Sequence, residues 1–173
     1  KTVSISSEES FYRLELLTKD ENSVEKSSLE ECLTSFVTPE VLQGDNKVDC
    51  DICGTKTNFT FVTCLTHLPD QLFIHPKRFT FDLMKMQTVK LNHEISFPHK
   101  LDLFPFTRTG QAMQAASAEA NESESQGGQV DNSRFDAKSF WPGGRALSEE
   151  DVSAYRENCF YSLAGVLVHR GRA

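Results

Sequence analysis

The spacing of apolar residues predicts one clear helix in the first third of the chain. Apolar positions recur at intervals of three and four residues, as on one face of a helix: Leu29, Cys32, Leu33 and Phe36. Ser28 is a favourable N-cap residue, and Glu31 three positions later completes a capping box. Pro39 and Gly44 predict that a second short helix begins at the proline and ends at the glycine. Cys32 is then most simply a small core residue of the first helix.

Period-two patterns predict β-strands elsewhere in the chain. Residues 11–17 mix apolar and polar positions as a half-buried strand does, and residues 59–63 alternate two sets of side chains. Three shorter runs are also β-prone: 72–74, 79–81 and 95–97. Residues 161–169 are apolar on both alternating sets, which is typical of a central strand covered on both faces. Helical segments beside such strands predict an α+β fold.

The stretch from 107 to 134 contains no aromatic residue and is dominated by small and polar side chains. Such a composition buries too little apolar area to offset the entropy of ordering, so we expect residues 107–134 to be a disordered acidic insertion. Residues 135–158 are expected to be a partly ordered insertion, in which Ser148 caps a short helix that runs to Tyr155.

Composition, charge and cysteine usage exclude several classes of protein. The chain has 173 residues, the length of one ordinary domain, and a net charge of −7. Its Lys and Arg residues are scattered, so no surface for nucleic acid is expected. The longest apolar run is far shorter than the roughly 20 residues of a membrane span, so no membrane contact is expected either. Five cysteines in dissimilar contexts do not make a disulfide framework, and they favour an intracellular location, the cytoplasm or the nucleus.

A Cys-x-x-Cys pair, Cys50 and Cys53, is the clearest candidate for metal binding. Two thiolates at this spacing can bind one zinc ion from a tight turn, but structural zinc needs four ligands, so the pair is half of a site. Cys64 and His67 formally complete a Cys3His set within the chain. Against that completion, two residues three apart near a strand point to opposite faces. A redox pair would precede a helix, and here a β-prone segment follows.

No cysteine of the chain stands in the context of a protease nucleophile. Cysteine protease chemistry needs a thiolate paired with a histidine that a third polar group holds. Cys32 lies on a predicted helix face, Cys64 in a predicted strand and Cys159 just before one. A complete catalytic site within this chain is therefore not expected.

Six short segments occur in an order and at spacings that resemble the catalytic domain of the ubiquitin-specific proteases, a family of cysteine deubiquitinases. They are SLEECL (28–33), GDNKVDCDIC (44–53), LPDQLFIHPKRFTFD (68–82), VKLNHEISFP (89–98), LDLFPF (101–106) and YSLAGVLVHRG (161–171). The resemblance implies a partial papain-like α+β fold, in which residues 1–106 form fingers and palm strands with a short helical region. Residues 159–173 would form a palm strand that leads into a blocking loop.

The resemblance also implies a channel for the C-terminal tail of ubiquitin. HPKRF (75–79) is similar to a signature segment beside this channel, so Phe79 would line it, although a core aromatic is the plain alternative. The two cations of this segment could equally be solvated. Pro76 departs from the family pattern, and because proline lacks a ladder donor it predicts either an edge position or a distorted channel. Residues 81–90 match the family's first blocking loop, and His169 would flank the channel.

By the same resemblance, a second Cys-x-x-Cys upstream of Lys1 would complete the zinc site, and we favour this over the internal set. The chain would begin after the family's nucleophilic cysteine and stop before its catalytic histidine, so we expect the chain alone to be inactive. The whole protein would hydrolyse isopeptide bonds at the C-terminus of ubiquitin, with ubiquitin and ubiquitinated proteins as its partners. Two alternatives stay open: a ubiquitin-binding module without catalysis, and a zinc-stabilised interaction domain.

Overall fold

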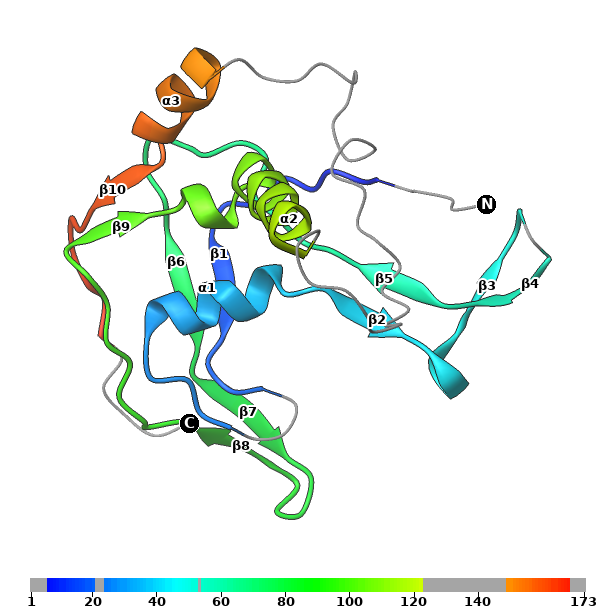
Figure 1. Cartoon of the computed structure of the whole chain (residues 1–173). Helices are drawn as coiled ribbons and strands as arrows, with labels where there is room; N and C mark the ends of the chain where they lie inside the picture. Colours follow the sequence, from blue (N-terminus) through cyan, green and yellow to red (C-terminus); the bar gives the residue numbers. More distant parts are fainter. Residues whose placement is uncertain (1–5, 21–23, 53, 123–148, 169–173) are drawn as a thin grey trace. The chain divides into compact units, whose positions relative to one another are not determined.

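The computed structural model of the chain describes residues 6–20, 24–52, 54–122 and 149–168, whose elements are labelled in Figure 1. These residues belong to two compact units. Unit 1 comprises Lys1–Leu14, Leu65–Phe73 and Pro98–Leu167, and unit 2 comprises Glu15–Cys64, Ile74–Phe97 and Val168–Ala173. Each unit combines strands with helical segments, so the predicted α+β class is confirmed.

In unit 2, helix α1 (Leu29–Val37) begins where the sequence predicts. The Ser28 hydroxyl accepts the N–H of Glu31 at 3.1 Å, as an N-cap does. The Glu31 carboxylate reaches one residue further back than in the usual capping box, and it accepts the N–H of Ser27 at 2.7 Å. The residues of the helix that are buried are Leu29, Cys32, Leu33 and Val37. Cys32 is 1% exposed, so its interpretation as a core residue is confirmed.

The prediction of a second helix that begins at Pro39 is wrong. Residues Glu40–Leu42 form strand β2, which pairs antiparallel with β5 (Phe59–Phe61). Thr38 has a ψ of 127°, because the ring of a following proline disfavours the helical region for the residue before it. Gly44 has a positive φ of 63° and starts the short 3-10 turn η1 (Gly44–Asn46) instead of ending a helix.

The other described strands of this unit pair two by two. They are β3 (Val48–Cys50) with β4 (Thr55–Thr57), β1 (Leu14–Leu17) with β6 (Ile74–Lys77), and β7 (Phe79–Asp82) with β8 (Gln87–Lys90). The strand predicted at 11–17 is therefore shorter, and the one at 79–81 is confirmed. The run 72–74 lies mostly before β6, while the run 95–97 makes a single parallel bridge between Ser96 and Ser28.

In unit 1, strand β9 (Lys100–Asp102) pairs antiparallel with β10 (Phe160–Ser162), and the turn η2 (Phe104–Phe106) follows β9. Helix α3 (Glu149–Glu157) confirms the predicted short helix, and the ring of Tyr155 meets that of Phe104 edge-on at 6.4 Å. Buried apolar side chains form the core of the unit: Leu65, Leu101, Leu103, Phe104, Phe106 and Cys159. None of the described helices is long and apolar enough to span a membrane.

The expected disorder of residues 107–134 is wrong for the first part of that stretch. Helix α2 covers Arg108–Glu122, and Thr107, directly before it, is fully buried. The Thr107 hydroxyl accepts the N–H of Gly110 at 3.1 Å, as an N-cap does. The helix forms because Ala, Gln, Met and Glu are good helix formers, although they supply little apolar area. The rest of the two predicted insertions, residues 123–148, lies outside the described residues.

The central strand predicted at 161–169 is wrong over most of its length. Strand β10 ends at Ser162, and residues 163–168 follow without regular structure. Leu167 and Val168 are 98% and 74% exposed, and none of the described strands pairs with this segment. Residues 163–168 are therefore apolar on both alternating sets, although none of the described strands covers them. His169 lies outside the described residues.

Candidate functional site

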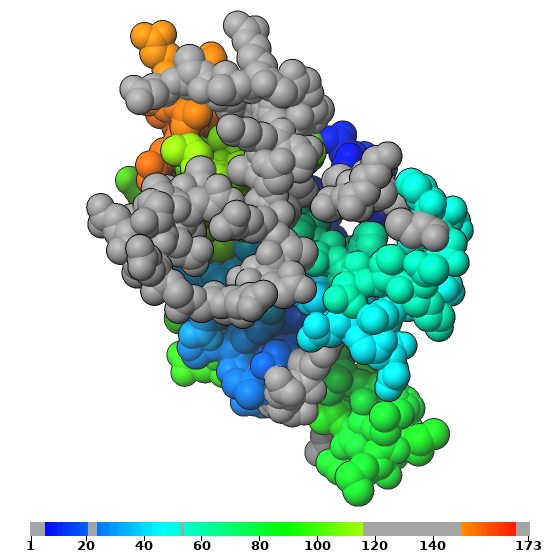
Figure 2. Space-filling view, turned by 45° about the vertical axis from the view of Figure 1, so that its right-hand side comes forward, coloured from blue at the N-terminus to red at the C-terminus, as the bar shows by residue number. Residues whose placement is uncertain are grey.

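The β7–β8 hairpin carries Phe79, the residue predicted to line a channel. Phe79 lies opposite Lys90 at the base of the hairpin, and Phe81 lies opposite Thr88 further along. The two phenylalanines are 45% and 53% exposed. Because a core aromatic would be buried, the plain alternative for Phe79 does not hold in this structure. The hairpin, which is drawn green in the space-filling view (Figure 2), instead exposes both rings.

The turn of this hairpin is fixed by Asp82. One carboxylate oxygen of Asp82 accepts the N–H groups of Met84 and Lys85, at 2.9 and 3.1 Å. The N–H of Lys85 is the main cause that lowers the pKa of the Asp82 carboxyl. Met86 completes the turn with a positive φ of 49°. The turn thereby displays flexible apolar side chains to solvent, because Met84 is 96% exposed and Met86 is 73% exposed.

The segment that leads into the hairpin makes polar contacts with Glu15 through strand β6. The Nζ of Lys77 lies 2.9 Å from a carboxylate oxygen of Glu15 on β1, and the Nδ1 of His75 lies 3.9 Å from the other oxygen. Strand β6 pairs with β1 in a two-stranded sheet, so it is an edge strand among the described residues. Pro76 is tolerated there because an edge strand leaves part of its donors unpaired, which fits the first of the two predicted explanations.

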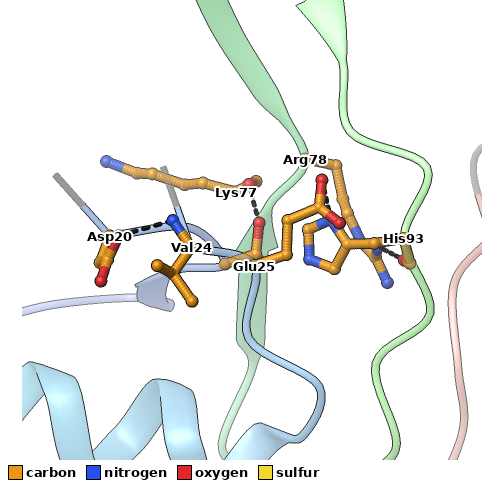
Figure 3. A network of polar contacts seen from close by, with 7 residues as sticks. Asp20, Val24, Glu25, Lys77, Arg78 and His93 are labelled. Carbon is orange, nitrogen blue, oxygen red and sulfur yellow. Dashed lines mark hydrogen bonds and ion pairs between the residues drawn. The ribbon is translucent and has the colours of Figure 1, made fainter. Parts of the chain in front are cut away.

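The base of the hairpin is joined to the chain before helix α1 by a polar network (Figure 3). The carbonyl of Arg78 accepts the N–H of Leu91 at 2.7 Å, and the Arg78 guanidinium donates to the carbonyl of His93. The Nδ1 of His93 lies 3.6 Å from a carboxylate oxygen of Glu25. The sequence gives no signal that His93 and Glu25 meet, because they are far apart along the chain.

The candidate metal ligand Cys50 ends strand β3 and lies at a turn. The N–H of Gly54 donates to the carbonyl of Cys50 at 2.8 Å, and Gly54 has a positive φ of 65°, so a tight knuckle is present here. Cys53 lies outside the described residues. No group of three or more His, Cys, Asp and Glu side chains that could hold a metal ion occurs in the part of the chain that the structure describes. The zinc site, with either completion, stays a prediction.

Two thiols are buried and poorly suited to nucleophilic attack. Cys32 is in the core of unit 2 and Cys159 in the core of unit 1. Burial raises the pKa of both thiols. A raised pKa lowers the thiolate fraction, whereas a cysteine nucleophile needs it increased. Both residues therefore act as core side chains, which the sequence predicts for Cys32 alone.

Comparison with known proteins gives consistent matches. A family model described as "Ubiquitin carboxyl-terminal hydrolase" matches residues 11–173. "Ubiquitin carboxyl-terminal hydrolase 24" of Homo sapiens is 38% identical over 146 residues, which are 84% of this chain and 5% of that protein. "Ubiquitin carboxyl-terminal hydrolase 47" of Xenopus tropicalis is 31% identical over 158 residues, which are 84% of this chain and 12% of that protein.

A solved structure is also similar to part of the chain. It is the "SAGA Ubp8/Sgf11/Sus1/Sgf73 DUB module bound to ubiquitin aldehyde", with 29% identity and a TM-score of 0.43 over 56% of this chain and 20% of that one. The present chain thus spans a small share of the length of the proteins that it matches.

Proposed function

The chain belongs to the ubiquitin carboxyl-terminal hydrolase family, and we propose that it forms part of a deubiquitinase. Its α+β structure is a partial form of the papain-like fold of the ubiquitin-specific proteases. The whole protein would be a thiol protease that hydrolyses isopeptide bonds after the C-terminus of ubiquitin, with ubiquitin and ubiquitinated proteins as its partners. The observation that carries this proposal is the family match over residues 11–173. The intracellular location stays a prediction.

The role proposed for this chain is to bind ubiquitin. The β7–β8 hairpin would form one wall of the tail channel, and the exposure of Phe79 and Phe81 supports this role, because an extended peptide can pack on their rings. The flexible Met84 and Met86 would adapt to the bound tail at the tip. The strands β2–β5 and β3–β4 would form the fingers that contact the body of ubiquitin. His169 would flank the channel, as the family resemblance implies.

Catalysis is proposed to depend on residues outside this chain. A thiol protease needs a cysteine of lowered pKa beside a histidine, and burial raises the pKa of both core thiols, Cys32 and Cys159. The purified chain should therefore not hydrolyse a ubiquitin–fluorophore amide. The full-length protein should hydrolyse it in a thiol-dependent reaction. Binding of ubiquitin without hydrolysis by the full-length protein would instead indicate a ubiquitin-binding module, and absence of both would overturn the proposal.

A Phe79→Ala variant of the full-length protein tests the channel role. We expect a raised Michaelis constant for ubiquitin conjugates with little change in the melting temperature, because a ring that is 45% exposed contributes less to the core than a buried one. Phe160→Ala is the matched control, because Phe160 is 56% exposed and lies on β10 of unit 1, outside the hairpin. A large loss of stability with normal kinetics in the folded fraction would remove Phe79 from the channel.

We also propose that Cys50 and Cys53 supply half of a structural zinc site, with a second pair beyond Lys1. The tight turn at Gly54 supports this, because it suits the geometry of a zinc knuckle. The purified chain should bind zinc weakly, since two thiolates fill half of a tetrahedral site. Tight one-to-one binding that is lost in Cys64→Ser would favour the internal set instead.

A further inference from the structure

The β7–β8 hairpin has little structure of its own to hold it in place. It is a two-stranded sheet without a third described strand, and most of its apolar side chains are exposed. An isolated two-stranded hairpin is only marginally stable in water. Its order and its direction therefore depend on the contacts at its base.

The segment 91–96, which follows the hairpin, supplies those contacts. At its start, the N–H of Leu91 donates to the carbonyl of Arg78 at 2.7 Å. At its end, the N–H of Ser96 donates to the carbonyl of Ser27 at 2.8 Å, and the N–H of Leu29 donates to the carbonyl of Ser96 at 2.9 Å. The segment is thus tied to the hairpin on one side and to the start of helix α1 on the other.

His93 lies between these two contacts and belongs to the network in Figure 3. Its side chain is 10% exposed, and its Nδ1 lies 3.6 Å from the carboxylate of Glu25. Neither ring nitrogen makes a hydrogen bond within the part of the chain that the structure describes. Burial of such a group costs free energy that an aliphatic side chain of similar size would not cost. The requirements of the core alone therefore do not explain a histidine at this position.

Glu25 is itself held in place by the backbone around it. It forms an antiparallel bridge with Lys19, and the N–H of Lys26 donates to the carbonyl of Thr18 at 3.0 Å. The backbone around Glu25 is therefore held in place, and its carboxylate lies 3.6 Å from the Nδ1 of His93 in the segment that carries the hairpin.

We infer that His93 is a positioning residue, which fixes the β7–β8 hairpin through Glu25 so that the hairpin can receive the ubiquitin tail. The inference rests on the proposed function for the identity of the tail. The Arg78 guanidinium also restrains this segment, because it donates a hydrogen bond to the His93 carbonyl. Loss of the His93–Glu25 pair loosens the base of the hairpin without removing any hydrogen bond of the core.

Amide hydrogen exchange of the purified chain tests the first part of this inference. In His93→Leu and in Glu25→Gln, amides of residues 79–90 should exchange about fivefold faster, the effect of losing one partly exposed polar contact. Amides of α1 and the melting temperature should stay unchanged or, for His93→Leu, rise. The double variant should exchange no faster than the single ones, because both remove the same pair.

Matched controls are His99→Leu and Glu94→Gln, two exposed residues, which should change nothing. Unchanged exchange of residues 79–90 in both variants would overturn the inference. A general increase that includes α1, together with a lower melting temperature, would also overturn it, since this result indicates a purely structural role.

Binding by the full-length protein tests the second part. The variants should bind intact ubiquitin about fivefold more weakly, and they should bind ubiquitin that lacks its C-terminal Gly-Gly as tightly as the parent does. Equal weakening for both forms, or no weakening, would overturn the role in tail binding. If the unaltered protein binds neither form, the proposed function fails and the tail role fails with it, while hydrogen exchange still decides whether His93 fixes the hairpin.

Discussion

Substitution of Gly110 by alanine tests whether the first turn of α2 packs on η2. A Cβ atom at this position would lie 1.9 Å from the carbonyl oxygen of Phe104 and 3.1 Å from the Cα of Pro105. Both contacts are with backbone, so no side-chain rotation can relieve them. The same carbonyl accepts the hydroxyl of Thr107 at 2.7 Å, so a shift of the turn also disturbs the cap of α2.

The expected change in the free energy of unfolding is the difference between a stabilising contribution and a destabilising one. An alanine inside a helix is normally more favourable than glycine by about 1 kcal/mol. Overpacking of a tight contact costs about 1–3 kcal/mol, and a backbone overlap of this size belongs at the upper end. The net loss is therefore about 2 kcal/mol, which for a chain of this length lowers the melting temperature by about 4–8 °C.

The assay is thermal unfolding of the 173-residue chain, followed by circular dichroism and by amide exchange of residues 108–115. Gly165→Ala is the matched control, because a Cβ there meets no atom within 4 Å. It should change stability by less than about 0.5 kcal/mol. If Gly110→Ala is as stable as the parent or more stable, with unchanged exchange in α2, the helix does not pack on η2.

Three further predictions concern caps and thiols. Ser28→Ala should cost about 1 kcal/mol in denaturant unfolding, because it removes the acceptor for the N–H of Glu31. The pKa of Glu31 is lowered chiefly by its hydrogen bond from the Ser27 backbone, so this carboxylate stabilises the fold above the ordinary glutamate pKa and loses that effect as the pH falls through the lowered value. The stability difference between the parent and Glu31→Gln should accordingly shrink in acid, and a constant difference would contradict it. Cys32 and Cys159 should resist iodoacetamide until the chain unfolds, because burial raises the pKa of both.

The sequence predicts α1 well because all its signals are local. The cap, the carboxylate at the third position and the apolar face lie within ten residues, and they need no partner from elsewhere to be recognised. Pro39 illustrates the opposite case. Taken alone, a proline after a threonine is a good helix start, but the segment from Glu40 pairs with Phe59–Phe61, and a partner some 20 residues away cannot be seen in a local pattern.

The wrong prediction of disorder for residues 107–122 has a different physical origin. A composition without aromatic residues argues against a core, but a helix needs only good propensity, a cap and one side that packs. Thr107 supplies the cap, and Gly110 allows the close approach to Phe104. Two signals were therefore present in the sequence, a threonine three positions before a glycine and a run rich in alanine. A composition that is poor in aromatic residues argues against a core, and it does not argue against a short capped helix.

Sequence motifs can indicate where the candidate site lies. The contacts that its side chains make can be determined only from the register of the strands. Lys77 ends strand β6 and Arg78 follows it directly, so the alternation of side chains in an extended chain already predicts that they point to different environments. Which environment each one meets depends on strands far away in sequence: Lys77 meets Glu15 on β1, and Arg78 meets the carbonyl of His93 beyond β8. The exposure of Phe79 follows from the same register, because the next ladder begins at this residue and has no third strand among those described. Motifs thus locate the hairpin, whereas the contacts that hold it, above all His93 with Glu25, become visible once the strands are paired.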